Sequence, residues 1–331
     1  MLMNRKILFY IVILVLIALL SGCGNNYTSD IKEVNDTAEI IENDFSLLEN
    51  NINKIAASYS EIMETKLSEK DMNDIKKKYK YSENGILYNP IYTDCSSGLL
   101  SGYKEIDELL EERLYKSEII DKEFIDSYNK FAIIDQVYLN SSDGLLRVYP
   151  GVELISGVSP KEAFSEFHFY YLADEEHNKE KKGVWLLRPY RDPVTQKWAV
   201  SLIAPSYSNE LLCVIGFDFL IENLKKQYLE DDMFLVSSDG NIIISDDSYN
   251  EIFGLPNIES IYFYETFMGE MYSGDSYNLK KNKDIRVREL FDEIIKNDVE
   301  QFTYKLDRKY TVIVEKIDVI DSYLIKMISM D

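Results

Sequence analysis

The chain has 331 residues, of which 46% are hydrophobic, and a formal net charge of −22 at pH 7. A chain of this length can bury a substantial core in one large domain or two ordinary ones. So large a negative charge excludes nucleic-acid binding by counterion release and flat association with an anionic lipid surface.

The N-terminus combines a basic start with an apolar segment. Arg5 and Lys6 precede an uninterrupted apolar run, residues 7–20, which ends in Leu20-Ser21-Gly22-Cys23. This order is typical of a secretory signal peptide. The alternative is an uncleaved transmembrane anchor, which needs about 18 or more apolar residues, and the run is shorter. Under either interpretation the chain after residue 23 lies outside the cytoplasm, and no later segment predicts a second membrane crossing.

The small residues before the cysteine resemble the lipobox of bacterial lipoproteins. The resemblance implies that residues 1–22 are a lipoprotein signal peptide and that Cys23 is acylated and followed by a polar tether to residue 30. Cys95 and Cys213 then remain. Cys213 lies in an apolar run, where a free cysteine packs as a small hydrophobe. A disulfide between Cys95 and Cys213 is an alternative that the sequence leaves open.

Beyond the tether, apolar residues recur at alternating steps of three and four, which predicts a long amphipathic helix. We assign residues 31–80 to it. Its seam either lies along the chain's own domains as a spine, which we favour, or pairs with a second copy in a homodimeric coiled coil. The seam positions are Ile31, Val34, Ala38, Ile41, Phe45, Leu48, Ile52, Ile55, Tyr59 and Ile62.

From residue 133 the pattern changes to short apolar strands. Residues 133–139 and 145–149 flank Ser141-Ser142-Asp143-Gly144, a turn in which glycine accepts a positive φ. The same unit recurs 96 residues later, where residues 233–236 and 242–244 flank Ser237-Ser238-Asp239-Gly240. The repeat predicts two related sheet domains in tandem.

Further strands and helices complete both domains. Strands are predicted at 184–187, 198–204 and 211–219, and again at 302–306, 309–314 and 323–328, with helices at 221–229 and 287–295. Antiparallel sheets flanked by helices predict an α+β fold with lobes at 81–229 and 230–331. Because the chain stops just after its last strand, we expect no output domain.

Patterns typical of catalysis are absent from the sequence. It has two histidines, His168 and His177, and no HExxH, Gly-x-Ser-x-Gly or P-loop pattern. The turns at Asp143 and Asp239 lack the ligand spacing of a calcium loop. We therefore predict that the protein is not an enzyme and has neither a metal site nor a cofactor.

The densest cluster of aromatic and charged residues spans 166–218 and ends in Asp218, at the end of an apolar strand. A carboxylate there requires a partner, because burying it alone is costly. One hypothesis is a structural partner, such as Arg188, Arg191 or backbone N–H groups. The other is a cavity in which carboxylates meet a ligand's cation and aromatic faces add cation–π contact. The residues alone do not decide between them.

Several runs in this region resemble the double Cache (dCache) family, the extracytoplasmic sensor domains of bacterial and archaeal chemoreceptors and sensor kinases. They are Val184-Trp185, Arg188-Pro189-Tyr190-Arg191-Asp192-Pro193, Lys197-Trp198-Ala199-Val200-Ser201, Ala204-Pro205 and Ile215-Gly216-Phe217-Asp218. The resemblance extends roughly over residues 31–331. It implies a long N-terminal helix, a membrane-distal PAS-like lobe that usually binds the ligand, and a membrane-proximal lobe.

The resemblance also implies site residues. Tyr190 and Asp192 match a Tyr-x-Asp pair and Asp218 a later aspartate, which bind the ligand's amine in amino-acid-binding members. Residues 168–171, His-Phe-Tyr-Tyr, replace an Arg-x-Trp-Tyr run, so the arginine that binds a ligand carboxylate is missing. That departure favours an amine, a modified amino acid or another small metabolite over an ordinary α-amino acid. The predicted ligand-binding residues are Tyr190, Asp192, Asp218, Trp185, Tyr170, Tyr171 and His168.

Together these features predict a lipid-anchored, extracytoplasmic, small-molecule-binding protein of the sensor type. Its acyl anchor implies a separate transmembrane partner, such as a kinase, a chemoreceptor or a transporter. The alternative is a structural or adhesion lipoprotein whose lobes no longer bind ligand. Inward-facing Asp192 and Asp218 in a cavity would support binding, whereas aspartates paired with arginines in a filled core would support the alternative.

Overall fold

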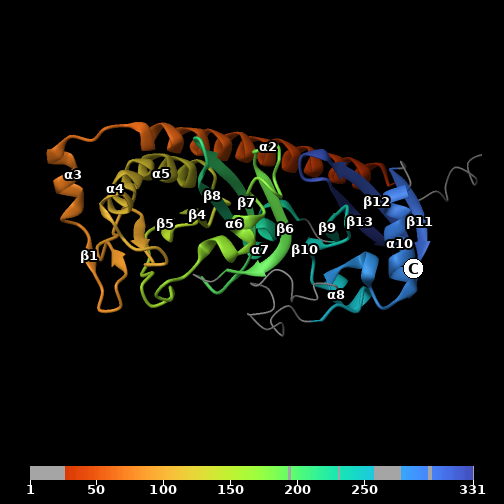
Figure 1. Cartoon of the computed structure of the whole chain (residues 1–331). Helices are drawn as coiled ribbons and strands as arrows, with labels where there is room; N and C mark the ends of the chain where they lie inside the picture. Colours follow the sequence, from red (N-terminus) through yellow and green to blue (C-terminus); the bar gives the residue numbers. More distant parts are fainter. Residues whose placement is uncertain (1–26, 193–194, 230–231, 257–276, 297–299, 331) are drawn as a thin grey trace, which may run out of the picture.

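The computed structural model describes residues 27–192, 195–229, 232–256, 277–296 and 300–330. The predicted signal peptide and Cys23 lie outside the described residues. No helix within the described residues is long and apolar enough to cross a membrane. The fold is α+β, with one long helix and two antiparallel sheets, as predicted (Figure 1).

Helix α2 (Thr28–Glu64) runs along both sheets as a spine of about 55 Å (Figure 1). The predicted seam is confirmed: every position from Val34 to Ile62 is buried and Ile31 is partly buried. The seam packs on strands of the first sheet and on β12 and β13 of the second. Its apolar surface is therefore covered by the chain's own lobes, which supports the spine over the coiled coil.

The predicted helix over residues 31–80 is wrong in its C-terminal part. Helix α2 ends at Glu64, and a separate helix α3 spans Glu69–Lys76. Ser68 begins α3, because its side-chain oxygen accepts the backbone N–H of Asp71 at 3.1 Å. This serine cap favours a new helix start over continuation.

The first sheet has eight antiparallel strands in the order β1-β2-β3-β5-β4-β8-β7-β6. The predicted strands correspond to β4 to β8, whereas β1 to β3 were not predicted. Helices α4 (Glu108–Lys116) and α5 (Asp121–Lys130) lie beside α2 near the end of the molecule that carries α3 (Figure 1). The strand bounds are Lys80–Tyr81, Leu87–Tyr88, Ser97–Leu100, Gln136–Asn140, Leu145–Tyr149, Val184–Arg191, Trp198–Tyr207 and Leu211–Leu220 for β1 to β8.

Helix α7 (Ile221–Tyr228) leads into the second sheet, ordered β10-β9-β13-β12-β11. One face of this sheet packs on α2, and the other packs on α8 (Ser248–Ile252) and α10 (Ile285–Lys296). The N-terminal end of α2 lies at this lobe (Figure 1). The strands are β9 Met233–Ser237, β10 Ile242–Ser245, β11 Gln301–Lys305, β12 Lys309–Ile317 and β13 Ser322–Ser329.

The two hairpin turns predicted as a repeat have the same local structure. Ser141 and Ser237 each donate a hydroxyl hydrogen bond to the aspartate two residues on, and each hydroxyl accepts a backbone N–H four residues on. Gly144 and Gly240 have φ of 91° and 94°. Only glycine adopts this backbone readily, so the repeated Ser-Ser-Asp-Gly sequence specifies the repeated turn.

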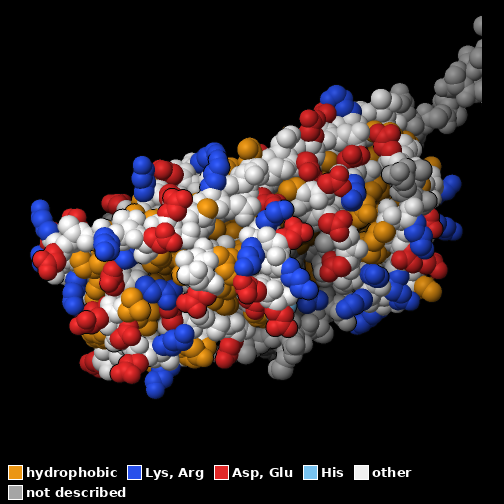
Figure 2. Space-filling model, turned by 45° about the horizontal axis from the view of Figure 1, so that its top comes forward, with side chains coloured by type: hydrophobic (Ala, Val, Ile, Leu, Met, Phe, Trp, Pro, Cys, Tyr) orange, Lys and Arg blue, Asp and Glu red, His pale blue; other side chains and the backbone are white. Residues whose placement is uncertain are grey.

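The first sheet has two differently packed faces. Its α2 face belongs to a core that continues into the second lobe. Its other face is covered by the segment containing η2 (Phe164–Glu166) and α6 (His168–Tyr171). The predicted site residues are distributed over both faces. Acidic and basic side chains are interspersed over the exterior seen in Figure 2.

Candidate functional site

A polar row crosses the first sheet on the face away from α2. Strand register places Leu186, Ser201, Asp218 and Gln136 side by side on β6, β7, β8 and β4. Neighbouring residues in one row project from the same face of a sheet. Ser201, Asp218 and Gln136 are all buried, so this row places three polar groups beneath the aromatic segment.

Asp218 is held by two hydroxyl groups. Ser201 Oγ donates to Asp218 Oδ1 at 2.5 Å, Tyr190 Oη donates to the same oxygen at 2.9 Å, and the two hydroxyls lie 2.7 Å apart. Burial, and secondarily repulsion from the Asp192 carboxylate, raises the pKa of Asp218 well above its usual range. Of the two hypotheses for this carboxylate, the structure supports a structural partner, but that partner is a pair of hydroxyls instead of Arg188, Arg191 or backbone N–H groups.

Asp192 is also buried, and it organises a turn. Its Oδ2 accepts the backbone N–H of Thr195 at 2.5 Å and the Thr195 hydroxyl at 2.6 Å. Both Asp192 and Asp218 are only 4% exposed. These carboxylates therefore lie behind the molecular surface.

Tyr190 connects the buried acids to the surface. Its hydroxyl reaches Asp218, and the His168 ring meets the Tyr190 ring edge-on with centroids 4.8 Å apart. Burial and the nearby Asp218 raise the pKa of Tyr190 well above its usual range, so it is a neutral hydrogen-bond donor at physiological pH. Four of the predicted residues, Tyr190, His168, Asp192 and Asp218, thus lie close together.

Of the three aromatic residues predicted to wall the pocket, Trp185 and Tyr171 line a common cleft, whereas Tyr170 does not. Trp185 shares its row with Leu202 and projects to the α2 face, where its ring stacks on Phe45 at 4.5 Å. Tyr170 is buried in the core on the opposite face. Side chains alternate along β6, so Trp185 projects to one face of the sheet while Tyr170 packs on the other. The sequence pattern did not reveal this separation.

A cleft of about 460 Å³ lies between the two lobes. It includes four of the predicted residues, His168, Tyr171, Trp185 and Tyr190, whereas Asp192, Asp218 and Tyr170 do not line it. Its distal wall is completed by Leu172, Leu186, Leu187, Arg188 and Pro189, and its proximal wall by Ser237, Ser238, Asp239, Asn241, Ile320 and Asp321. No ligand contact was predicted in this second lobe.

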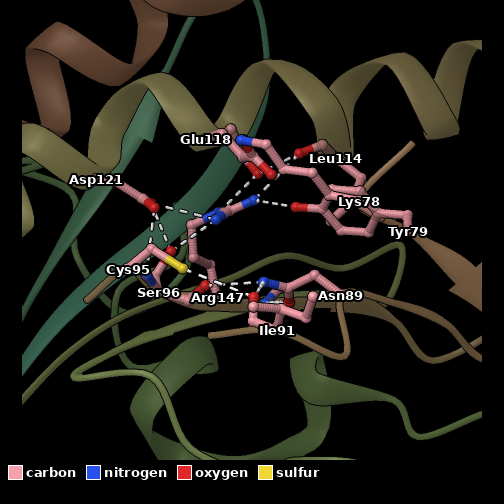
Figure 3. Close-up of polar contacts among 12 residues, drawn as sticks. Lys78, Tyr79, Asn89, Ile91, Cys95, Ser96, Leu114, Glu118, Asp121 and Arg147 are labelled. Atoms are coloured by element: carbon pink, nitrogen blue, oxygen red, sulfur yellow. Dashed lines mark hydrogen bonds and ion pairs between the residues drawn. The ribbon is translucent and has the colours of Figure 1, made fainter. Parts of the chain in front are cut away.

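A buried arginine at the far end of the first sheet was not predicted. Arg147, on β5, is completely buried (Figure 3). Burial alone would lower its pKa, but Tyr79, Asp121 and Glu118 together hold it above the usual arginine value. Its guanidinium donates to Ser117 Oγ at 2.9 Å, Ser96 Oγ at 2.6 Å, Tyr79 Oη at 2.8 Å, Asp121 Oδ1 at 3.2 Å and the Leu114 carbonyl at 3.3 Å.

Both described cysteines are free thiols, with Cys213 buried and Cys95 partly exposed. Across the described part of the chain, no three His, Cys, Asp or Glu side chains cluster in a way that could hold a metal ion. The described residues therefore present a candidate binding cleft and a buried acid–hydroxyl network.

Replacing Asp218 with asparagine should remove a pH dependence of stability. The folded-state pKa of Asp218 is raised, so the folded chain retains a proton that the unfolded chain loses above about pH 4. The stability that Asp218 contributes is therefore fully present below the unfolded pKa and is lost as pH rises through the folded pKa. Asparagine keeps an oxygen for Ser201 and Tyr190 and does not ionise.

Urea unfolding of both proteins from about pH 4 to pH 8 measures this effect. The stability of Asp218→Asn relative to the unmodified chain should increase with pH. Parallel stability curves would show that Asp218 ionises in the folded protein at no greater cost than in the unfolded one.

Comparison with known proteins gives structural matches alone: no family model and no curated protein matches the chain. The ligand-binding domain of the Pseudomonas aeruginosa chemoreceptor PctB, in complex with L-Arg, is similar at 12% identity and a TM-score of 0.48, covering 91% of this chain and 86% of that one. The ligand-binding domain of the Campylobacter jejuni chemoreceptor Tlp3, in complex with L-valine, is similar at 14% identity and a TM-score of 0.47, covering 92% and 94%.

The extracellular domain of the putative histidine kinase mmHK1S-Z2 is similar at 11% identity and a TM-score of 0.47, covering 92% of this chain and 97% of that one. These structural neighbours are ligand-binding or extracellular domains of chemoreceptors and of a histidine kinase.

Proposed function

We propose that this chain is a lipid-anchored, extracytoplasmic, small-molecule-binding protein of the sensor type, and that its ligand occupies the cleft between the lobes. The observation that carries the proposal is the cleft itself, which includes His168, Tyr171, Trp185 and Tyr190. Its volume of about 460 Å³ lies within the range of small-molecule sites.

The lining favours an amine-bearing ligand. Aromatic faces attract cations, and Tyr190 is fixed in place by its hydrogen bond to Asp218. In this proposal Tyr190 contacts the ligand, while Asp218 and Asp192 position Tyr190 and the turn that follows it. The raised pKa of Asp218 agrees with a positioning role, because a protonated carboxyl would not compensate a ligand's charge.

Anchoring through Cys23 would place the second lobe next to the membrane. Helix α2 begins at this lobe (Figure 1). Lys326 of β13 pairs with Asp30 at 3.1 Å and with Glu33 at 2.8 Å. The backbone N–H of Val319 also binds the Glu42 carboxylate. A transmembrane kinase, chemoreceptor or transporter would therefore meet this lobe, and α2 joins it to the distal one.

A structural or adhesion lipoprotein is the second candidate. The observation that favours it is the filled face around Asp218, where Phe164, Phe167, Phe169 and Tyr170 are all buried. Neither Asp192 nor Asp218 lines the cleft, so ligand binding depends on the other residues of its walls.

The test is a thermal-shift screen of the full chain in detergent against amines, amino acids, purines and small carboxylates. A ligand at 100 times its Kd stabilises the folded state by about 2.7 kcal/mol. We expect an amine-bearing hit whose shift is lost in Tyr171→Ala, because that change removes an aromatic wall of the cleft.

The matched control is Tyr103→Ala, which removes a 44% exposed tyrosine outside the cleft and should leave the shift unchanged. If no compound in the panel shifts the melting temperature, the binding function is wrong and the structural candidate takes its place. A hit that Tyr171→Ala does not affect would move the ligand out of this cleft.

A further inference from the structure

The two walls of the cleft belong to different lobes and carry opposite charges. Arg188 lies on the distal wall, and Asp239 and Asp321 lie on the proximal wall. All three side chains are exposed. We propose that the ligand is dipolar and bridges the lobes, with its anionic group on Arg188 and its ammonium group on Asp321 and Asp239. This inference rests on the proposed function and assigns ligand contacts to the proximal lobe.

A bulge on the edge strand β6 places Arg188 in the cleft. Leu186 pairs with Ser201 and Tyr190 pairs with Ala199, so three residues of β6 oppose a single residue of β7. Bulges redirect side chains and are common beside functional sites, and an edge strand tolerates Pro189, which has no N–H to donate. Arginine can bind a carboxylate or a phosphate through two parallel hydrogen bonds.

The proximal wall is a rigid acidic corner. The backbone N–H of Ser238 donates to the Asp321 carbonyl at 2.9 Å, and the Ser238 hydroxyl donates to Asp321 Oδ2 at 2.5 Å. Asp321 has a φ of 43°, in the left-handed region. Non-glycine residues in this conformation cost free energy and cluster at ligand clamps. The backbone thus holds the Asp321 carboxylate beside the cleft.

Asp239 adds a second carboxylate to this corner. It accepts hydrogen bonds from the Ser237 hydroxyl and from Asn241 Nδ2, the latter at 2.7 Å. Lys316 neutralises the charge of Asp321 only in part, because its Nζ lies 3.9 Å from Asp321 Oδ1 but 2.7 Å from Asp318 Oδ1. A carboxylate can accept further hydrogen bonds, so both aspartates retain capacity for an ammonium group.

A dipolar ligand satisfies both walls, whereas a singly charged one satisfies only one of them. An anion alone would face two carboxylates, and a dication alone would face the guanidinium. Repulsion between like charges therefore disfavours ligands that carry only anionic or only cationic groups, and this repulsion makes the cleft specific for dipolar ligands. Bridging also couples ligand binding to the relative position of the lobes, since each lobe holds one end of the ligand.

The test measures the affinity of the full chain in detergent, by isothermal titration calorimetry, for four probes. 4-Aminobutyrate and phosphoethanolamine are dipolar and distinguish a carboxylate from a phosphate, whereas putrescine carries only cations and succinate only anions. We expect a dipolar probe to bind at least about tenfold more tightly than putrescine or succinate, which corresponds to about 1.4 kcal/mol. Arg188→Gln and Asp321→Asn should each weaken it by a similar factor.

Asparagine suits position 321 because it tolerates the left-handed conformation. The matched controls are Arg191→Gln on the same strand and Asp318→Asn, neither of which lines the cleft, and both should keep affinity within about twofold. Failure of both dipolar probes to bind, or binding that is unaffected in Arg188→Gln and Asp321→Asn, overturns the bridging inference. The proposed function fails separately, when no compound of the wider panel shifts the melting temperature.

Discussion

Replacing Arg147 with methionine is expected to lower the free energy of unfolding by about 3–5 kcal/mol, the cost of removing one partner from a buried charge pair. The side chain is completely buried, and its guanidinium binds groups from the segments just before β1 and β3 and from helices α4, η1 (Ser117–Ile120) and α5 (Figure 3). Methionine matches the length of the side chain but leaves Asp121 without its cation. Urea unfolding followed by circular dichroism measures the loss.

Two further variants separate the buried network from a general effect of losing an arginine. Arg308→Met removes an arginine from an ion pair whose partners are both about half exposed, and it should cost well under 1 kcal/mol. Adding Asp121→Asn to Arg147→Met should recover part of the loss, because the unpaired carboxylate is removed. Equal losses from Arg147→Met and Arg308→Met would contradict a dominant stabilising role for the buried network.

Local patterns in the sequence predicted most of the fold. The three-and-four spacing of α2 is a property of one continuous segment, so it identified the buried seam without knowledge of its partners. The two Ser-Ser-Asp-Gly turns are also locally specified, since the Ser141 and Ser237 hydroxyls that shape them bond within five residues. The end of α2 was missed because Glu64 to Ser68 contains neither glycine nor proline, and the cap at Ser68 is the only local indication.

The candidate site was harder to predict because its residues come together through strand register. The position of Asp218 correctly indicated that the carboxylate needs partners, but Ser201 becomes one only through the pairing of β7 with β8. Arg147 was missed for the same reason, since its partners are spread over residues 79–121. The proximal wall of the cleft depends on how two lobes meet, which no local pattern encodes.

Replacing Gly216 with alanine is expected to cost at least about 3 kcal/mol, the upper end for overpacking a core. Gly216 pairs with Tyr138 across β8 and β4, and a Cβ at this position would lie 2.0 Å from Tyr138 Cζ and 2.3 Å from its hydroxyl oxygen. The ring has no room to move, because it is buried and packs edge-on against Phe169 at 5.9 Å. Glycine at position 216 gives the Tyr138 ring room to lie beside Asp218. Burial, and secondarily the charge of Asp218, raises the pKa of Tyr138.

Urea unfolding again measures the cost of Gly216→Ala, and Gly157→Ala is the control, because a Cβ there would meet only the Leu154 carbonyl oxygen at 3.7 Å. The substitution should cost much less in a Tyr138→Ala background, since the clashing ring is gone and the two changes share one space. Additive losses in the double variant would mean that the strand backbone, and not the Tyr138 ring, requires glycine. A much smaller cost of Gly216→Ala in that background would instead show that this glycine makes room for the Tyr138 ring beside Asp218. The placement of Tyr190 at the cleft depends on the same buried network.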